Sequence, residues 1–142
     1  MFETDSAEAT EAVGAALARE LHDGDVVFLT GELGAGKTTL VRGAARALGC
    51  ETAVTSPTFA LGHRYPAGPE LTVTHIDLYR LASLDTEDPD LLAGYLGAGR
   101  ICFVEWAERG GAELGAPRLR VELRHAGFEH RTIEVRGGHP SA

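Results

Sequence analysis

The chain of 142 residues has a formal net charge of −8; 44% of its residues are hydrophobic and 24% are charged. These values are ordinary for a globular protein and fit a single domain with its own core, spanning residues 1–142. The negative charge argues against a primary nucleic-acid-binding protein, because clustered positive charge holds phosphate backbones. No apolar run approaches the ~20 residues of a membrane span, and the acidic N-terminus lacks the pattern of a signal peptide. We therefore expect a cytoplasmic protein with no membrane segment.

The first half of the chain predicts a helix, a strand and a second helix. Asp5 or Ser6 can cap the first helix, which is expected to run to about Glu20. Residues 25–30 form an apolar run typical of a short buried strand, and residues 39–48 show the apolar stripe of an amphipathic helix. A glycine-rich segment joins this strand to this helix. The pattern therefore indicates a strand–loop–helix unit near the N-terminus.

The second half of the chain is expected to contribute mostly strands. We place them at residues 59–65, 71–77 and 101–104, and in a terminal hairpin over residues 119–135. A short helix is expected to begin at Asp88, its cap, with Pro89 at the first helical position. This order of elements predicts an α/β layered domain with a mixed central sheet flanked by helices.

The only lysine of the chain, Lys37, lies in the segment Gly31-Glu32-Leu33-Gly34-Ala35-Gly36-Lys37-Thr38. This segment has the G-x-x-x-x-G-K-[ST] pattern of the phosphate-binding loop. In that loop, backbone N–H groups such as those of Gly34, Ala35 and Gly36 surround phosphates that the lysine also reaches. The plainer alternative is a glycine-rich turn between two core elements. The strand before the loop and the helix after it favour a P-loop NTPase-like domain that binds a nucleoside triphosphate.

A triphosphate site of this kind also needs metal ligands and a group that orients the attacking water. The Thr38 hydroxyl is placed to ligate Mg²⁺, and Thr39 begins the helix whose positive end can meet an inner phosphate. Glu105 closes an apolar strand, as a Walker-B acid would, and Asp77 closes another strand. The division of roles between these two acids stays open, and each on its own could be a solvated strand end.

Two further features have ordinary alternatives. The segment Ser56-Pro57-Thr58-Phe59 could be an ordinary turn or a loop that senses the terminal phosphate and the metal. The only tryptophan, Trp106, directly follows Glu105, so it belongs either to the core or beside the nucleotide pocket.

Four segments taken together resemble one protein family, the bacterial TsaE (YjeE-type) ATPases. These segments are residues 31–40, residues 56–59, His75-Ile76-Asp77-Leu78-Tyr79-Arg80-Leu81 and Glu105-Trp106. The resemblance spans nearly the whole chain, and the last two segments are its most specific parts. It implies Mg²⁺-dependent binding and hydrolysis of ATP in the synthesis of threonylcarbamoyladenosine in tRNA. It further implies docking on the protein pair that transfers the threonylcarbamoyl group, which the chain would reset without modifying the tRNA itself.

The resemblance also implies roles for single residues, beyond phosphate and metal binding by Lys37, Thr38 and Thr39. Glu105 would help to ligate Mg²⁺, and Asp77 would support hydrolysis. Thr58 would lie in a switch-like loop, and Trp106 would line the site.

Two positions carry a weaker implication from the same resemblance. Arg131, at the start of the last expected strand, would lie close to the nucleotide. Ser6, at the start of the first helix, would border the adenine. Residues 84–99 match the family only loosely and locate no partner surface.

Two other classes of function remain open from the sequence. A small-molecule kinase would need an acceptor pocket and a lid with arginines, for which little chain remains. A nucleotide-gated interaction protein with negligible turnover would share the same loop, because binding and hydrolysis use the same residues.

Overall fold

The computed structural model describes residues 1–32, 36–51, 53–54, 62–79, 92, 94–109, 114–127 and 129–137. The described helical elements are α1 (Ala7–Ala18), α2 (Lys37–Ala47) and the 3₁₀ turn η2 (Ala107–Arg109). The described strands are β1 (Phe2–Thr4), β2 (Val26–Gly31), β3 (Gly62–Pro66), β4 (Thr72–Asp77), β5 (Arg100–Glu105), β6 (Leu119–His125) and β7 (Arg131–Gly137).

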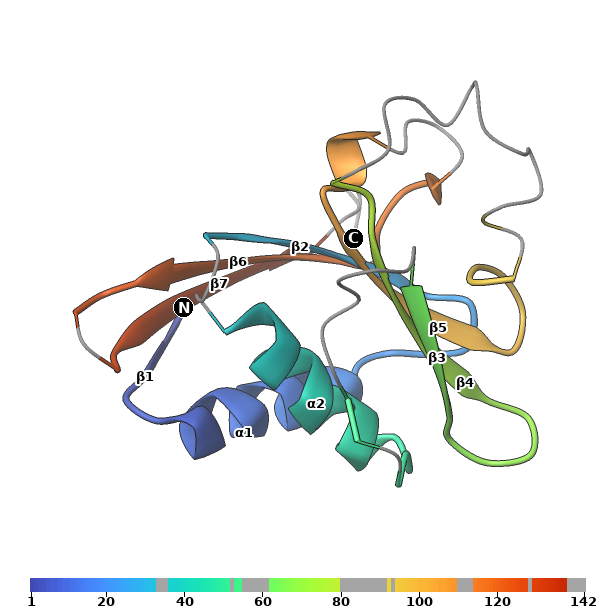
Figure 1. The fold of residues 1–142 in the computed structure, drawn as a ribbon, viewed down its shortest axis with the longest axis horizontal. Coiled ribbons are helices and arrows are strands. Elements are labelled where there is room, and N and C mark those ends of the chain that lie inside the picture. The colour runs from blue at the N-terminus through green and yellow to red at the C-terminus, as the bar shows by residue number, and fades with distance from the viewer. Residues whose placement is uncertain are drawn as a thin grey trace.

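The strands form one mixed sheet in the order β1-β7-β6-β2-β5-β4-β3 (Figure 1). β2 runs parallel to both of its neighbours, β5 and β6, and β4 runs parallel to β5. The outer pairs, β1 with β7, β6 with β7 and β3 with β4, are antiparallel. The predicted α/β class with a mixed sheet is confirmed. Because parallel strands end at the same edge, the carboxyl ends of β2, β4, β5 and β6 meet there.

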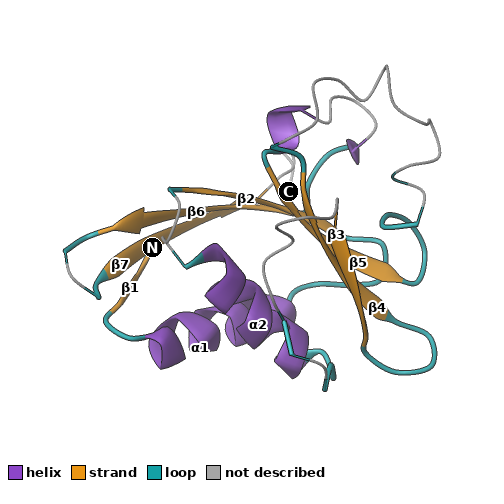
Figure 2. Ribbon diagram, in the orientation of Figure 1, coloured by secondary structure: helices purple, strands orange, loops and turns teal. Residues whose placement is uncertain are grey.

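Both described α-helices cover the same face of the sheet (Figure 2). The main core lies between this face and the helices, where Val27 and Leu29 of β2 pack with Leu40 and Val41 of α2. A smaller apolar cluster on the opposite face includes Val104 of β5, Leu92 and Tyr95 from turns, and Ala107 of η2. In the part of the chain that the structure describes, neither α-helix has the length and apolarity to cross a membrane.

Strand alternation directs the acidic ends of two neighbouring strands toward the helices. Ile101 and Phe103 of β5 pack in the helix-side core, whereas Cys102 and Val104 between them pack on the other face. Since side chains alternate along a strand, Glu105 continues the helix-side row. The same rule places His75 and Asp77 of β4 on the side of Val73. The sheet therefore presents these polar side chains to the start of α2.

The terminal segments and one predicted helix differ from expectation. β1 was not predicted, because three residues at a chain end carry no readable period; it pairs with the edge strand β7. The Ser6 side chain caps α1 by accepting from the N–H of Ala9, as predicted, although α1 ends at Ala18. The helix predicted from Asp88, with its expected end near Leu96, begins outside the described residues, and residues 94–96 lie in turns.

Helices α1 and α2 approach each other closely through two glycines. A Cβ atom built on Gly14 of α1 would overlap the Leu40 carbonyl oxygen. A Cβ atom on Gly43 of α2 would overlap the backbone of Glu11. Because these neighbours are backbone atoms, they cannot move aside without separating the helices.

Gly43→Ala is therefore expected to lower the free energy of unfolding by about 1–3 kcal/mol. In an open helix the same change would stabilise by about 1 kcal/mol, because alanine has the higher helix propensity, so the sign is diagnostic. Urea unfolding measures the difference. Gly137→Ala is the control, since nothing lies within 4 Å of its added methyl group. A Gly43→Ala protein as stable as the unchanged chain would contradict the close approach.

Candidate active site

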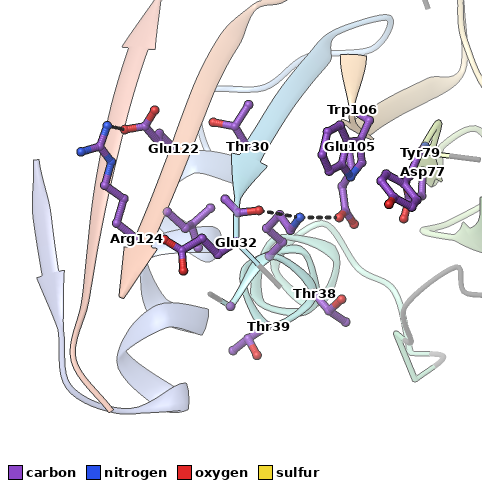
Figure 3. A pocket seen from close by; sticks show the side chains of 14 residues that line it. Thr30, Glu32, Thr38, Thr39, Asp77, Tyr79, Glu105, Trp106, Glu122 and Arg124 are labelled. Atoms are coloured by element: carbon purple, nitrogen blue, oxygen red, sulfur yellow. Dashed lines mark hydrogen bonds and ion pairs between the residues drawn. The ribbon is translucent and has the colours of Figure 1, made fainter. Parts of the chain in front are cut away.

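A pocket of about 970 Å³ opens at the edge where the parallel strands end (Figure 3). Its floor is formed by Gly31 and Glu32 after β2 and by residues 36–39 at the start of α2. One wall consists of the ends of β4 and β5 with the residues that follow them, and the other consists of residues 122–124 of β6. This is the position in an open α/β sheet where ligands bind.

The N-terminus of α2 points into this pocket. Gly36 occupies the cap position with φ +102°, a left-handed conformation that favours glycine, and as a glycine it offers no side chain to cap the helix. Thr38 and Thr39 of the first turn line the pocket. The first N–H groups of a helix lack intrahelical partners and carry partial positive charge, so this end is suited to an anion. Gly34 and Ala35 lie outside the described residues.

Lys37 crosses the floor of the pocket and reaches two oxygen atoms. Its Nζ donates to the carbonyl oxygen of Gly31 at 2.9 Å and lies 3.0 Å from Oε1 of Glu105. Only 13% of the lysine side chain is exposed, so its ammonium group is held between the end of β2 and the end of β5.

Glu105 is a buried acid with two polar neighbours. Its Oε1 faces Lys37, and its Oε2 lies 2.6 Å from Nε2 of His75 on the adjacent strand. Burial alone would raise the pKa of Glu105, but the hydrogen bond and charge of His75, together with the charge and hydrogen bond of Lys37, outweigh it. The pKa of Glu105 is therefore held below its ordinary value, which keeps the side chain ionised.

Asp77 stands beside Glu105, because the two residues are partners in the parallel register of β4 and β5. Its Oδ1 accepts the N–H of Tyr79 at 2.9 Å, which fixes the turn after β4. The Tyr79 ring packs on Trp106 with 4.8 Å between ring centroids. Trp106 has φ 60°, the only positive value recorded for a non-glycine residue in the described ranges. Such backbone strain clusters at functional sites.

No sequence motif pointed to the opposite wall of the pocket. There Arg124 and Glu122 of β6 form an ion pair of 2.6 Å (Figure 3). Thr30 of β2 is paired with Glu122 in the sheet register and also lines the pocket. β6 follows β2 in the chain by almost 90 residues, so only its pairing with β2 brings this wall to the site. His75 was also given no role, although its alternation with Asp77 places it near Glu105.

Besides Gly34 and Ala35, three predicted positions are not among the described residues that line this pocket. Ser6 caps α1, where its hydroxyl accepts from Ala9. Arg131 begins β7 and donates to the carbonyl oxygen of His130. Thr58 and the rest of its predicted switch-like loop lie outside the described residues.

Comparison with known proteins decides the family. The sequence model of the family described as "Threonylcarbamoyl adenosine biosynthesis protein TsaE" matches residues 4–133. The chain belongs to the TsaE family. Curated TsaE proteins, each named "tRNA threonylcarbamoyladenosine biosynthesis protein TsaE", are similar to it over most of its length. That of Streptomyces coelicolor is 44% identical, with 80% of this chain and 78% of the relative covered. That of Treponema pallidum is 41% identical, with 92% and 95% covered.

A solved structure also matches this TsaE-family chain. The crystal structure of YdiB from Bacillus subtilis has a TM-score of 0.74 and 33% sequence identity. The match covers 99% of this chain and 86% of YdiB. The family and its place in tRNA threonylcarbamoyladenosine biosynthesis agree with the resemblance read from residues 31–40, 75–81 and Glu105-Trp106.

Proposed function

We propose that this chain is a cytoplasmic ATPase that binds ATP with Mg²⁺ and hydrolyses it. We further propose that it acts on the protein complex that transfers the threonylcarbamoyl group to tRNA. The observation that carries the proposal is the position of Lys37. Its ammonium group lies near the N-terminus of α2, where the cap residue is Gly36, beside Glu105 on the floor of one pocket.

The chain's own groups supply the positive charge that phosphates require. The first N–H groups of α2 face the pocket, and Lys37 is the cation on its floor. In the structure Lys37 contacts Glu105 and Gly31. We propose that Lys37 turns from Glu105 to the outer phosphates when the nucleotide binds, which leaves Oε1 of Glu105 available to the metal.

The donor set fits a magnesium ion. Mg²⁺ prefers oxygen ligands and is usually held by one or two carboxylates together with phosphate oxygens and waters. Thr38 and Glu105 both line the pocket and offer a hydroxyl and an ionised carboxylate. When bound, the metal would neutralise negative charge that develops on the phosphates. We assign Thr38 and Glu105 to hold it.

Asp77 is the candidate for orienting the attacking water. It lies beside Glu105 in the register and lines the same pocket. Its Oδ1 is already engaged by the N–H of Tyr79, which fixes the carboxyl group relative to the backbone. Its other oxygen is then the one available to accept a proton or a hydrogen bond from water. Thr58, Arg131 and Ser6 remain predicted contributors.

The proposed partners are the proteins of the threonylcarbamoyl-transferase complex, with tRNA involved only indirectly. The relatives are named for the biosynthesis of this modified nucleoside. A net charge of −8 suits a protein that binds other proteins better than one that follows a phosphate backbone. We propose that nucleotide turnover resets that complex.

The test is phosphate release by the purified chain, measured alone and with the threonylcarbamoyl-transfer proteins of the same organism. We expect Mg²⁺-dependent release that changes when the partners are added. Release that appears only with a small-molecule acceptor would point to a kinase. Partner binding that requires ATP without any release would point to a nucleotide-gated interaction protein. Unchanged turnover and no complex would contradict the proposed role.

A further inference from the structure

His75 is a fully buried histidine, 0% exposed, in the middle of β4. Its Nε2 lies 2.6 Å from Oε2 of Glu105. An ionised carboxylate can only accept hydrogen bonds, so the ring nitrogen that faces it carries the hydrogen. The other nitrogen, Nδ1, is buried and has no hydrogen-bond partner among the residues that the structure describes.

Packing and stability alone do not account for a histidine at this position. The neighbouring positions on the helix side, Val73 and Phe103, are apolar and fully buried. A buried nitrogen without a partner costs free energy that an aliphatic side chain of similar size would avoid. The one polar contact of the His75 side chain with the described residues is with Glu105. The contribution of His75 is therefore expected at Glu105.

The contact with His75 gives the two oxygens of the Glu105 carboxylate different surroundings. Oε2 is engaged by the ring, so the carboxylate cannot rotate freely about its last side-chain bond. Oε1 is then held on the side of the pocket, where it lies 3.0 Å from Lys37. Groups that hydrogen-bond to a metal-binding side chain fix its orientation in this way, and their loss weakens metal binding.

We propose that His75 is a positioning residue, which fixes Glu105 by donation from Nε2 and thereby sets the affinity of the nucleotide-bound site for Mg²⁺. This inference rests on the proposed function, because it needs Glu105 to hold the metal. This role differs from a role in folding. A variant without the donor would keep the fold, but the carboxylate of Glu105 would lose its fixed orientation.

Two polar variants of His75 distinguish the effect of losing the hydrogen-bond donor from the effect of losing the imidazole ring. The amide nitrogen of glutamine reaches about as far as Nε2, so His75→Gln keeps a donor for Glu105. The amide of asparagine ends near the position of Nδ1, so His75→Asn lacks that reach. His63 lies opposite His75 in the register of β3 and β4, and its Nδ1 contacts the Tyr65 hydroxyl instead. His63→Asn is therefore the matched control.

The measurement is a Mg²⁺ titration of the full chain saturated with ADP, followed by the fluorescence of Trp106, the only tryptophan. We expect His75→Asn to weaken Mg²⁺ binding roughly 10- to 100-fold, with His75→Gln close to the unchanged chain. ADP affinity in the presence of a chelator should be the same in all variants. If His75→Asn does not fold, His75→Leu replaces it, because an apolar side chain suits the buried surroundings and also lacks the donor.

The outcomes distinguish this inference from the function on which it rests. If the unchanged chain binds ADP with no dependence on Mg²⁺, the proposed function fails and the role of His75 falls with it. If the unchanged chain depends on Mg²⁺ but the donor-less variant binds the metal equally well, only the positioning role is overturned. Equal weakening in His75→Gln, His75→Asn and the His63 control would also overturn it, because that pattern reports general damage to the sheet.

Discussion

Lys37→Ala is expected to lower kcat/KM for ATP hydrolysis by a factor on the order of 10²–10³, as removal of one charge-stabilising group from an active site does. The physical reason is twofold. In the proposed function, the floor of the pocket loses the cation that would meet the outer phosphates. In addition, the buried carboxylate of Glu105 loses the ammonium group 3.0 Å away and then repels the incoming phosphates.

The companion variants for Lys37 test the geometry and the fold. Lys37→Arg keeps the charge but replaces a compact ammonium group with a wide planar fork, so only partial activity is expected. Arg46→Ala removes another cation of α2, at the opposite end of the helix, where Arg46 pairs with Glu11 on the surface. It should leave turnover unchanged. Phosphate release gives the rates, and the unfolding midpoint shows whether each variant is folded. A folded Lys37→Ala protein that hydrolyses ATP normally would remove Lys37 from the site.

The parts of the fold that the sequence predicted are those set by local rules. Ser6 predicts the start of α1, because capping needs only a side-chain oxygen and the next few N–H groups. The apolar run of residues 25–30 and the glycines that follow predict β2 and the loop before α2. The period of two in residues 119–123 predicts β6. In each case the residues that decide the structure are neighbours in the chain.

The missing parts depend on contacts between distant segments. The wall formed by Glu122 and Arg124 reaches the pocket only because β6 pairs with β2, which no local pattern reveals. The close approach of α1 and α2 depends on which glycines face each other, and helix periodicity leaves that undetermined. The contact between His75 and Glu105 requires the β4–β5 register, since neither residue is near the other in sequence.

Candidate site residues were predictable where chemistry and position in a motif coincide. Lys37 and Thr38 follow from the phosphate-binding loop, and Asp77 and Glu105 follow from the rule that parallel strands deliver their last residues to one edge. The structure places these residues in one pocket. The sequence could not divide the work between the two acids, because both have the same chemistry and the same position at a strand end. Their surroundings differ: Glu105 is buried between His75 and Lys37, whereas Asp77 engages the N–H of Tyr79.

Because the surroundings of the two acids differ, Glu105→Gln and Asp77→Asn are expected to lower ATP turnover in different ways. If Glu105 holds Mg²⁺ as proposed, Glu105→Gln is expected to lower turnover at limiting Mg²⁺ by on the order of 10²-fold, because the metal would lose a charged ligand. The neutral amide has only one acceptor oxygen. It can therefore accept from His75 or from Lys37 but not from both, and one of these two contacts is lost as well. Much of the loss should be recovered at high Mg²⁺, since excess metal compensates for weaker binding.

Asp77→Asn, at the register partner of Glu105, should respond to Mg²⁺ differently from Glu105→Gln. Its carbonyl oxygen can still accept the N–H of Tyr79, so the turn that carries Tyr79 should persist. Loss of the second oxygen's charge is expected to lower turnover by roughly 10²-fold or more at any Mg²⁺ concentration, the range of a lost general base. Phosphate release across a Mg²⁺ titration separates the two variants. If excess Mg²⁺ restores Asp77→Asn and not Glu105→Gln, the roles are reversed, and Asp77 becomes the metal ligand.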